Sequence, residues 1–196
     1  MALKRNIYLI LILLLSINGF SQKAVSLEEY KHHYQIHIKN TSAQINIDGD
    51  LNEADWAAAE TVSGFSKHYP IDDSTASKAT LVKVMYNKNY IYFGITCYDS
   101  KPYIGQSLKR DSRIRNNDGI GIVLDPLGKK TNGFYFSVTA FNVQADDILS
   151  AGEDDPSFSW DNKWYSAVKQ YEAYYTIEIA IPFKTIDRKS TRLNSS

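Results

Sequence analysis

The sequence predicts an all-β fold, an antiparallel β-sandwich with one short helix. Several short segments alternate between apolar and polar residues, which is the pattern of half-buried strands. The chain is also 13% aromatic, with 14 tyrosines, and aromatic residues favour strands over helices. No long amphipathic helix pattern separates these segments, so about seven strands in succession indicate a sandwich.

The N-terminus has the features of a secretory signal peptide, expected over residues 1–21. Lys4 and Arg5 supply the positive start, and residues 7–15 form a short apolar run. A membrane anchor would need about 20 apolar residues, but this run stops at Ser16. We therefore expect export to the periplasm, the outer membrane surface or the medium, and no transmembrane span in this chain.

Composition narrows the functional class. The chain has 22 basic and 22 acidic residues, so its formal net charge is zero. A nucleic-acid-binding protein would show a clear basic excess, and that class is therefore not expected. Cys97 is the only cysteine, so the domain holds together without an internal disulfide, and we expect Cys97 to be a small buried residue.

The N-terminal third predicts a leader followed by short elements. Residues 22–44 are expected to form a polar leader that ends in a first strand at residues 34–38. Its histidines lack the cysteine or carboxylate spacing of a metal site. A short strand at residues 45–47 and a turn at Asp48-Gly49 follow. The alanine-rich segment 51–60 predicts a short helix that Trp56 attaches to the core.

The middle and the end of the chain carry the clearest strand patterns. After a loop at residues 65–78, we expect two antiparallel strands at 81–86 and 90–98, each with one buried face. A last strand at 174–181 follows the same alternation. Pro182 ends it, because proline has no N–H group to donate to the ladder.

A hairpin at the centre organises the prediction. Strands at residues 120–124 and 134–141 are expected on either side of an Asn132-Gly133 turn, since both residues tolerate positive φ. Charged and polar residues collect at one end of this hairpin. We call them the charged rim: Lys109, Arg110, Asp111, Arg113, Arg115, Asn116, Asn117, Asp118 and, after the second strand, Asn142. The rim is the predicted place for a binding site.

Signatures of enzymes are sparse. The sequence has no Gly-x-Ser-x-Gly elbow, no phosphate loop and no histidine near the hairpin to act as a base. Asp146 and Asp147 could serve glycoside hydrolysis, but neighbours on a strand point to opposite faces. Catalysis by this domain is therefore not expected. The same two aspartates could hold calcium, although no Asp-x-Asp-x-Asp loop accompanies them.

Binding is better supported than catalysis. Sugar sites combine flat aromatic faces with charged hydrogen-bonding groups. Trp160 and Trp164 could supply such faces if both are exposed, or they could close the core between the sheets. The arginines of the rim could bind a sugar, or they could pair with Asp111 and Asp118. The sequence leaves both alternatives open.

The C-terminus departs from the strand pattern. Residues 188–196 resemble translated vector sequence attached to a broken reading frame. We therefore expect a sandwich domain over residues 45–187, a non-native tail over 188–196, and a natural protein that continues into a larger C-terminal domain.

One segment resembles a known family. The run from Ile47 to Ala59, Ile-Asp-Gly-Asp-Leu-Asn-Glu-Ala-Asp-Trp-Ala-Ala-Ala, is similar to the opening signature of family-nine-type, DOMON-like carbohydrate-binding modules. The hairpin through residues 90–99, the strand after Asn117-Asp118 and the segment Glu178–Phe183 continue the resemblance in order. The closer resemblance is to exported proteins of Bacteroidetes-like bacteria, in which such a module precedes a domain of unknown function. The resemblance implies a jelly-roll-like sandwich that binds carbohydrate and accompanies glycosidases.

The resemblance also shows departures. Where the sugar-binding members carry a clamping tryptophan, a glutamate and an arginine, this chain has Arg115, Gly121 and Ser137. Their second clamping tryptophan lies beyond the end of this chain. The resemblance therefore implies the fold but not the family's sugar clamp.

These observations together predict a non-catalytic carbohydrate-binding domain of an exported protein used in carbohydrate catabolism. Its expected partners are an oligo- or polysaccharide and the missing C-terminal domain. The alternatives are an interaction domain that docks on that missing domain and, less well supported, a glycoside hydrolase. The candidate ligand-binding residues are Trp160, Trp164, Arg110, Arg113, Arg115, Asp118 and Asn142. No cofactor other than calcium is considered, with Asp146 and Asp147 as its candidate ligands.

Overall fold

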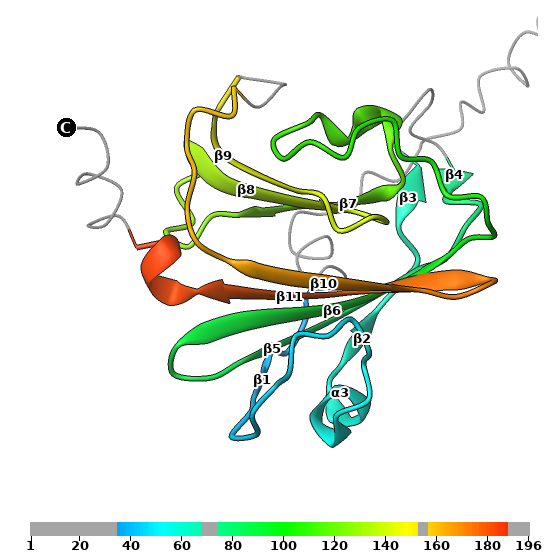
Figure 1. Cartoon of the computed structure of the whole chain (residues 1–196). Coiled ribbons are helices and arrows are strands. Elements are labelled where there is room, and N and C mark those ends of the chain that lie inside the picture. The colour runs from blue at the N-terminus through cyan, green and yellow to red at the C-terminus, as the bar shows by residue number, and fades with distance from the viewer. Residues whose placement is uncertain (1–34, 68–73, 153–156, 188–196) are drawn as a thin grey trace, which may run out of the picture. The chain divides into compact units, whose positions relative to one another are not determined.

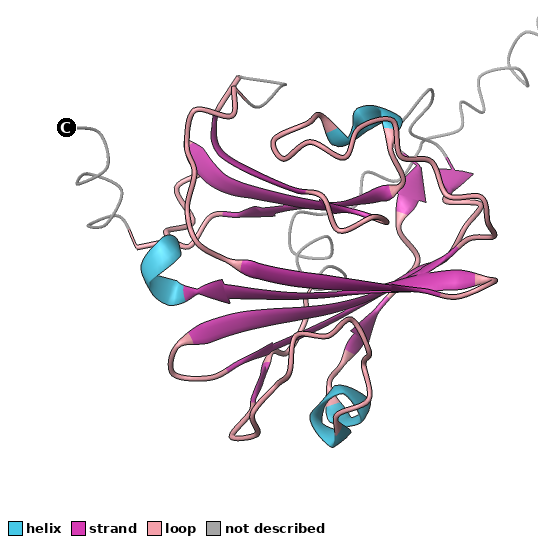
Figure 2. Cartoon of the chain, in the orientation of Figure 1, coloured by secondary structure: helices cyan, strands magenta, loops and turns pink. Residues whose placement is uncertain are grey.

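The computed structural model describes residues 35–67, 74–152 and 157–187. The expected signal peptide, nearly all of the leader and the tail at 188–196 lie outside the described residues. The described chain is mostly β-structure, arranged in two sheets that face each other with one short helix on the far side of the larger sheet (Figures 1 and 2). The predicted sandwich class is therefore confirmed. No helix of the described part is long and apolar enough to cross a membrane.

The larger sheet has the strand order β1-β5-β6-β11-β10, and β2 also pairs with β5. Its strands are β1 (Lys39–Asn40), β2 (Thr61–Val62), β5 (Thr80–Tyr86), β6 (Tyr90–Tyr98), β10 (Tyr165–Gln170) and β11 (Tyr174–Pro182). All pairs are antiparallel except β1 with β5. The predicted strand pair around residue 88 and the last strand, including its end at Pro182, are confirmed.

The smaller sheet has the order β7-β8-β9, and its strands are β7 (Gly119–Leu124), β8 (Asn132–Thr139) and β9 (Gln144–Ser150). A separate ribbon pairs β3 (Ser66–Lys67) with β4 (Ser74–Thr75). The helical elements are α3 (Ala54–Ala58) and two 3-10 turns, η1 (Ile114–Asn116) and η2 (Phe183–Thr185). The helix predicted within residues 51–60 is thus confirmed.

The main core lies between the two sheets. It takes alternate residues from each strand, such as Phe93 and Ile95 on β6, Ile177 on β11, and Phe136 and Val138 on β8. All are buried, and complete burial of such a side chain contributes roughly 1.5–3 kcal/mol. The period of two that predicted these strands therefore also selects the residues of the core.

The outer face of the larger sheet is buried as well. Met85, Tyr92 and Ala180 on this face pack against Ile45 and Trp56, which come from the segment around α3. The sequence analysis expected a polar outer face on these strands. Residues 41–60 lie across this face instead, which explains why polar positions of β11 are also buried.

A buried carboxylate attaches this segment to the sheet. Glu178 of β11 is fully buried and faces the segment. Its Oε2 accepts the N–H groups of Asp48 and Gly49 at 3.0 and 2.8 Å, and its Oε1 accepts the indole N–H of Trp56 at 3.0 Å. Burial raises the pKa of Glu178 to about 7, although the three hydrogen bonds favour the charged form.

Two glycines permit this close contact. Gly49 has a φ of +86°, and a Cβ there would lie 2.8 Å from the backbone carbon of Val168. Gly94 of β6 leaves room for the side chains of Leu51 and Trp56, since a Cβ added at this position would lie 2.9 Å from each of them. The Asp48-Gly49 signature and its tryptophan therefore serve the packing of this layer.

Five details of the sequence prediction were wrong. Residues 35–38 and 45–47 form no strand; Ile36 packs against the main core, and Ile45 and Ile47 pack on the outer face of the larger sheet. Asn132-Gly133 is the start of β8, and the turn of the hairpin lies at residues 125–131. Strands β9 and β10 were missed, because buried charges in β9 and mixed residues in β10 hide the alternation.

Glu178 should make stability depend on pH. Its pKa in the fold, about 7, exceeds the ordinary value of 4.5, so the folded protein holds this proton more tightly than the unfolded chain. The resulting stabilisation is complete below pH 4.5 and is lost as the pH rises through 7. In urea unfolding, the unfolding free energy of wild type minus that of Glu178→Gln should therefore decrease as the pH rises from 4.5 to above 7.

The matched control is Glu172→Gln, because the side chain of Glu172 is 90% exposed. Its unfolding free energy should follow that of wild type at every pH. A wild-type to Glu178→Gln difference that stays constant across the interval would contradict the assigned pKa.

Candidate functional site

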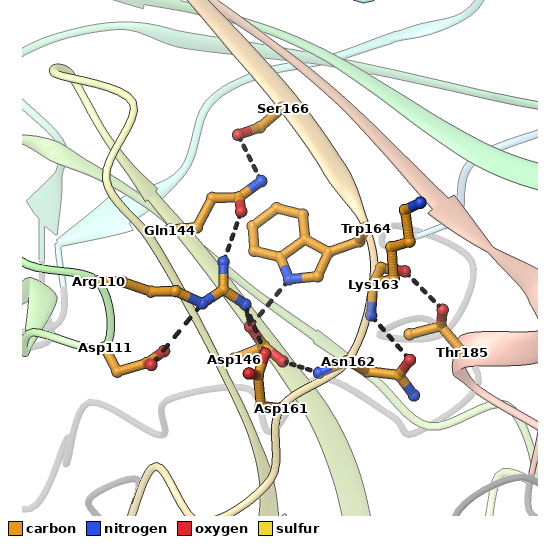
Figure 3. Close-up of polar contacts among 10 residues, drawn as sticks. All are labelled: Arg110, Asp111, Gln144, Asp146, Asp161, Asn162, Lys163, Trp164, Ser166 and Thr185. Atoms are coloured by element: carbon orange, nitrogen blue, oxygen red, sulfur yellow. Dashed lines mark hydrogen bonds and ion pairs between the residues drawn. The ribbon is translucent and has the colours of Figure 1, made fainter.

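Arg110 is the centre of the polar contacts at the charged rim (Figure 3). Its guanidinium donates to Gln144 Oε1 at 2.7 Å, to Asp146 Oδ1 at 2.5 Å and to Asp161 Oδ1 at 2.8 Å. Its Nε also lies 3.7 Å from an oxygen of Asp111. The side chain is 39% exposed, yet its donors are directed at protein acceptors. We call Arg110, Gln144, Asp146 and Asp161 the arginine clip.

Asp146 is the buried acceptor of the clip. It lies opposite Phe136 in the β8–β9 register and is fully buried. Besides Arg110, it accepts the indole N–H of Trp164 at 3.0 Å and the backbone N–H of Asn162 at 2.8 Å. Burial raises the pKa of Asp146 above its usual value, while these donors oppose the rise.

The clip joins the edges of the two sheets. Gln144 of β9 donates to the hydroxyl of Ser166 on β10 at 2.9 Å, and Ser166 donates to Asn142 at 2.7 Å. Trp164 immediately precedes β10 and is tied to β9 through Asp146. The clip therefore closes one open side of the sandwich, between β9 and β10 (Figure 3).

The structure decides between the two alternatives for Trp160 and Trp164, because both rings pack against the core. Trp164 is only 5% exposed and its ring packs edge-on against Phe136 at 5.3 Å. Trp160 is half-buried, with its ring against Phe134 at 5.4 Å and Phe136 at 6.0 Å. Both indoles thus contribute to the core, which is the alternative that the sequence left open for them.

The remaining candidates of the rim lie in different environments. Arg113 and Arg115 flank and enter η1 and are exposed. Asp118 is half-buried and accepts the backbone N–H of Ile104 at 2.7 Å, so it fixes the loop before β7. Asn142 has a φ of +58° in the turn between β8 and β9 and contacts Ser166. Arg113 and Arg115 are therefore exposed, as are Lys109 and Asn116 of the rim.

Asp146 and Asp147 do not form a common site. They pair with Phe136 and Tyr135, respectively, and so face opposite sides of the smaller sheet. Asp147 accepts the N–H groups of Ile148 and Phe158 and the hydroxyl of Ser157. Across the described residues, no group of three or more His, Cys, Asp or Glu side chains is placed to hold a metal ion.

Two of the positions of the family's clamp, Gly121 and Ser137, lie side by side on the smaller sheet. Gly121 and Ser137 are direct partners in the β7–β8 register. A Cβ on Gly121 would lie 3.2 Å from the ring of Tyr135, which occupies the space beside it. Ser137 is buried. Gly121 and Ser137 themselves therefore supply neither the acidic nor the basic side chain that the sugar-binding members carry at these positions.

A different surface has the shape and chemistry of a ligand site. At the end of β6, β10 and β11, a cavity of about 720 Å³ is lined by Lys88, Asn89, Tyr90, Asn162, Lys163, Tyr165, Pro182, Phe183, Lys184 and Thr185. This volume falls in the range of roughly 300–1,000 Å³ that is usual for small-molecule sites. We call it the tyrosine–lysine cavity. Tyr165 and Phe183 are 39% and 37% exposed.

Sequence reasoning missed this cavity, since its residues come from three separate segments. Register brings them together: Tyr165 pairs with Ala180, Ala180 with Tyr92, and Pro182 with Tyr90. The sequence held one signal of the cavity. Tyr90 and Tyr92 alternate with the apolar residues of their predicted strand, so both were expected on its outer face. That signal could not reveal Tyr165, because β10 itself was missed.

Arg110 should be needed for stability. Arg110→Ala removes the charged hydrogen bond to the buried Asp146, and such a bond contributes about 1.5–3 kcal/mol. We expect a fall of that order in the unfolding free energy, measured by urea denaturation. The neighbouring exposed residue gives a matched control, and Lys109→Ala should change the free energy by less than about 0.5 kcal/mol. Equal, small effects of both variants would show that the clip is not structural.

Comparison with known proteins identifies the family. A model described as carbohydrate family 9 binding domain-like matches residues 47–195, which is most of the chain. No curated protein gives a significant match.

Three solved structures share the fold. A carbohydrate binding module family 9 from Caldicellulosiruptor kristjanssonii in complex with glucose is 16% identical, with a TM-score of 0.53 over 75% of this chain and 68% of that chain. The cellotriose complex of a family 9 module from the same organism is 18% identical, with a TM-score of 0.52 over 76% and 67%. A putative carbohydrate-binding protein from Bacteroides uniformis is 11% identical, with a TM-score of 0.57 over 76% and 72%.

At these identities the structural similarity supports the fold, and the family model supplies the membership. The chain belongs to the carbohydrate family 9 binding domain-like family, a family of non-catalytic binding modules.

Proposed function

We propose that this chain is a non-catalytic carbohydrate-binding domain of an exported protein that takes part in carbohydrate breakdown. The observation that carries the proposal is the family match over residues 47–195. The similar modules solved with glucose and cellotriose support a saccharide as the class of ligand. Export rests on the signal-like sequence of residues 1–21.

The tyrosine–lysine cavity is the surface that we assign to the saccharide. Sugar recognition needs aromatic faces that are open to the C–H side of a ring, with polar groups beside them. Tyr90, Tyr165 and Phe183 supply the rings, and Asn89 and Asn162 supply amide groups. The indoles of Trp160 and Trp164 are packed in the core, so this cavity offers the better platform.

A second candidate function rests on another cavity. The end of the sandwich beside η2 has a cavity of about 680 Å³, lined by apolar residues such as Leu127, Phe134, Ile148, Phe183 and Ile186. Its predominantly apolar wall suits a protein partner more than a sugar. The expected larger C-terminal domain is the partner that this surface would take, which gives the interaction-domain alternative.

The test is calorimetric titration of the full chain with saccharides selected on a glycan array. We expect binding by wild type and weaker binding by Tyr165→Leu. Loss of one aromatic face should cost about 1 kcal/mol, roughly fivefold in Kd. Thermal unfolding of the variant checks that its fold is retained.

The comparison variant is Arg113→Ala with Arg115→Ala, which removes the exposed arginines of the charged rim. Full binding by this variant supports the cavity, whereas loss of binding here and not in Tyr165→Leu would move the site to the rim. The absence of any saccharide binding by wild type would overturn the proposed function and favour the interaction domain.

A further inference from the structure

Lysines from three distant parts of the chain meet at the tyrosine–lysine cavity. Lys88 lies in the turn between β5 and β6, Lys163 lies before β10, and Lys184 lies in η2. The side chain of Lys163 is placed over the ring of Tyr165, with Nζ 5.6 Å from its centroid. The antiparallel register of β6, β11 and β10 brings these segments to one end of the sheet.

Among the described residues, no aspartate or glutamate lines the cavity, and the charged residues that line it are lysines. Within the described part of the chain, no ion pair is recorded between a carboxylate and either Lys88 or Lys163, in contrast with Lys169, which pairs with Asp50 at 2.6 Å. The nearby Asp161 is engaged by Arg110 at 2.8 Å. The ammonium groups of Lys88 and Lys163 line the same cavity and neither is paired with a carboxylate of the described residues, so both would attract a bound anion.

A neutral hollow continues from the cavity. It has a volume of about 420 Å³ and shares Tyr90 and Tyr165 with the tyrosine–lysine cavity. Tyr92 and Asn87 line it, and Asn87 donates to the Tyr92 hydroxyl at 3.0 Å. Its floor includes Ala180, whose small side chain leaves space between the tyrosines.

The two hollows differ in charge but share their aromatic wall. The rings of Tyr90 and Tyr165 lie 6.3 Å apart at an angle of 61°, and those of Tyr90 and Tyr92 lie 5.7 Å apart. A ligand longer than one ring could therefore pass from the neutral hollow into the charged one. A free inorganic anion would use the lysines alone and leave the aromatic wall unused.

We propose that this continuous surface binds an acidic oligosaccharide, with a carboxylate or sulfate group against Lys88 and Lys163 and neighbouring sugar rings against Tyr90 and Tyr165. The inference rests on the proposed function for its saccharide part and adds the charge of the ligand. The carboxylate of a uronate and the sulfate of a sulfated sugar both present anionic oxygens to the lysines. The experiment compares an oligosaccharide of each kind.

The experiment titrates the full chain with three probes in low salt: an oligogalacturonate, a sulfated galactan oligosaccharide and a cello-oligosaccharide. Wild type should bind one of the acidic probes at least about tenfold more tightly than the neutral one, a difference equivalent to two exposed ion pairs. This preference should decrease as salt is added, because exposed charges are screened.

The variants are Lys88→Gln with Lys163→Gln, and the matched control Lys39→Gln with Lys67→Gln. Both pairs are exposed and change the net charge equally. The first pair should lose most of the preference for the acidic probe and keep its affinity for the neutral one. The control pair should retain the preference.

The outcomes separate the two proposals. Equal affinity of wild type for acidic and neutral probes, or equal loss in both variant pairs, would overturn the inference while leaving carbohydrate binding intact. Binding of sulfate or galacturonate as free ions, as tightly as the oligosaccharides, would also overturn it, because the aromatic wall would then contribute nothing. Failure of every saccharide to bind would overturn the proposed function itself.

Discussion

The sandwich depends on a buried carboxylate, Asp146, that holds the free edges of its two sheets together. A carboxylate is costly to bury unless donors surround it, and here Arg110, Trp164 and the backbone of Asn162 do so. Because these donors come from the loop before β7 and the segment before β10, one acceptor on β9 fixes three parts of the chain. The ring of Trp164 is then held edge-on against Phe136 in the core.

Glu178 repeats this arrangement on the other side of the larger sheet. It too accepts one indole N–H, from Trp56, together with backbone N–H groups. Each carboxylate thus orients a tryptophan that packs one layer onto a sheet. Arg110, Asp146, Glu178, Trp56 and Trp164 are thus used by the fold, and we therefore assign ligand recognition to other residues in our proposal. The residues that we propose for that role are the half-buried Tyr90, the exposed Tyr165 and the exposed lysines beside them.

The features that could be predicted from sequence are those that leave a signal within a few neighbouring residues. The strands β5, β6 and β11 were predicted because their alternation reports burial of one face directly. The charged rim was located correctly in the chain, but the pairing of Arg110 with Asp146 and Asp161 depends on residues 36 and 51 positions away. Strand β9 was missed because Asp146 and Asp147 occupy positions that a local pattern assigns to a loop. The cavity could not be predicted, since it needs the register of three strands to bring residues 90, 165 and 182 together.

We propose that the tryptophans support the fold whereas Tyr90 and Tyr165 contact the ligand. An NMR titration with the tightest-binding saccharide tests this division of roles directly. The chain has three tryptophans, so their indole N–H signals can be followed individually. We predict that the backbone amides of residues 87–90 and 162–165 shift on saturation, while the indole signals of Trp56 and Trp164, which are bound to buried carboxylates, stay in place. Large shifts of the Trp160 and Trp164 indole signals together with the amides around Arg113, and none at residues 87–90, would contradict it.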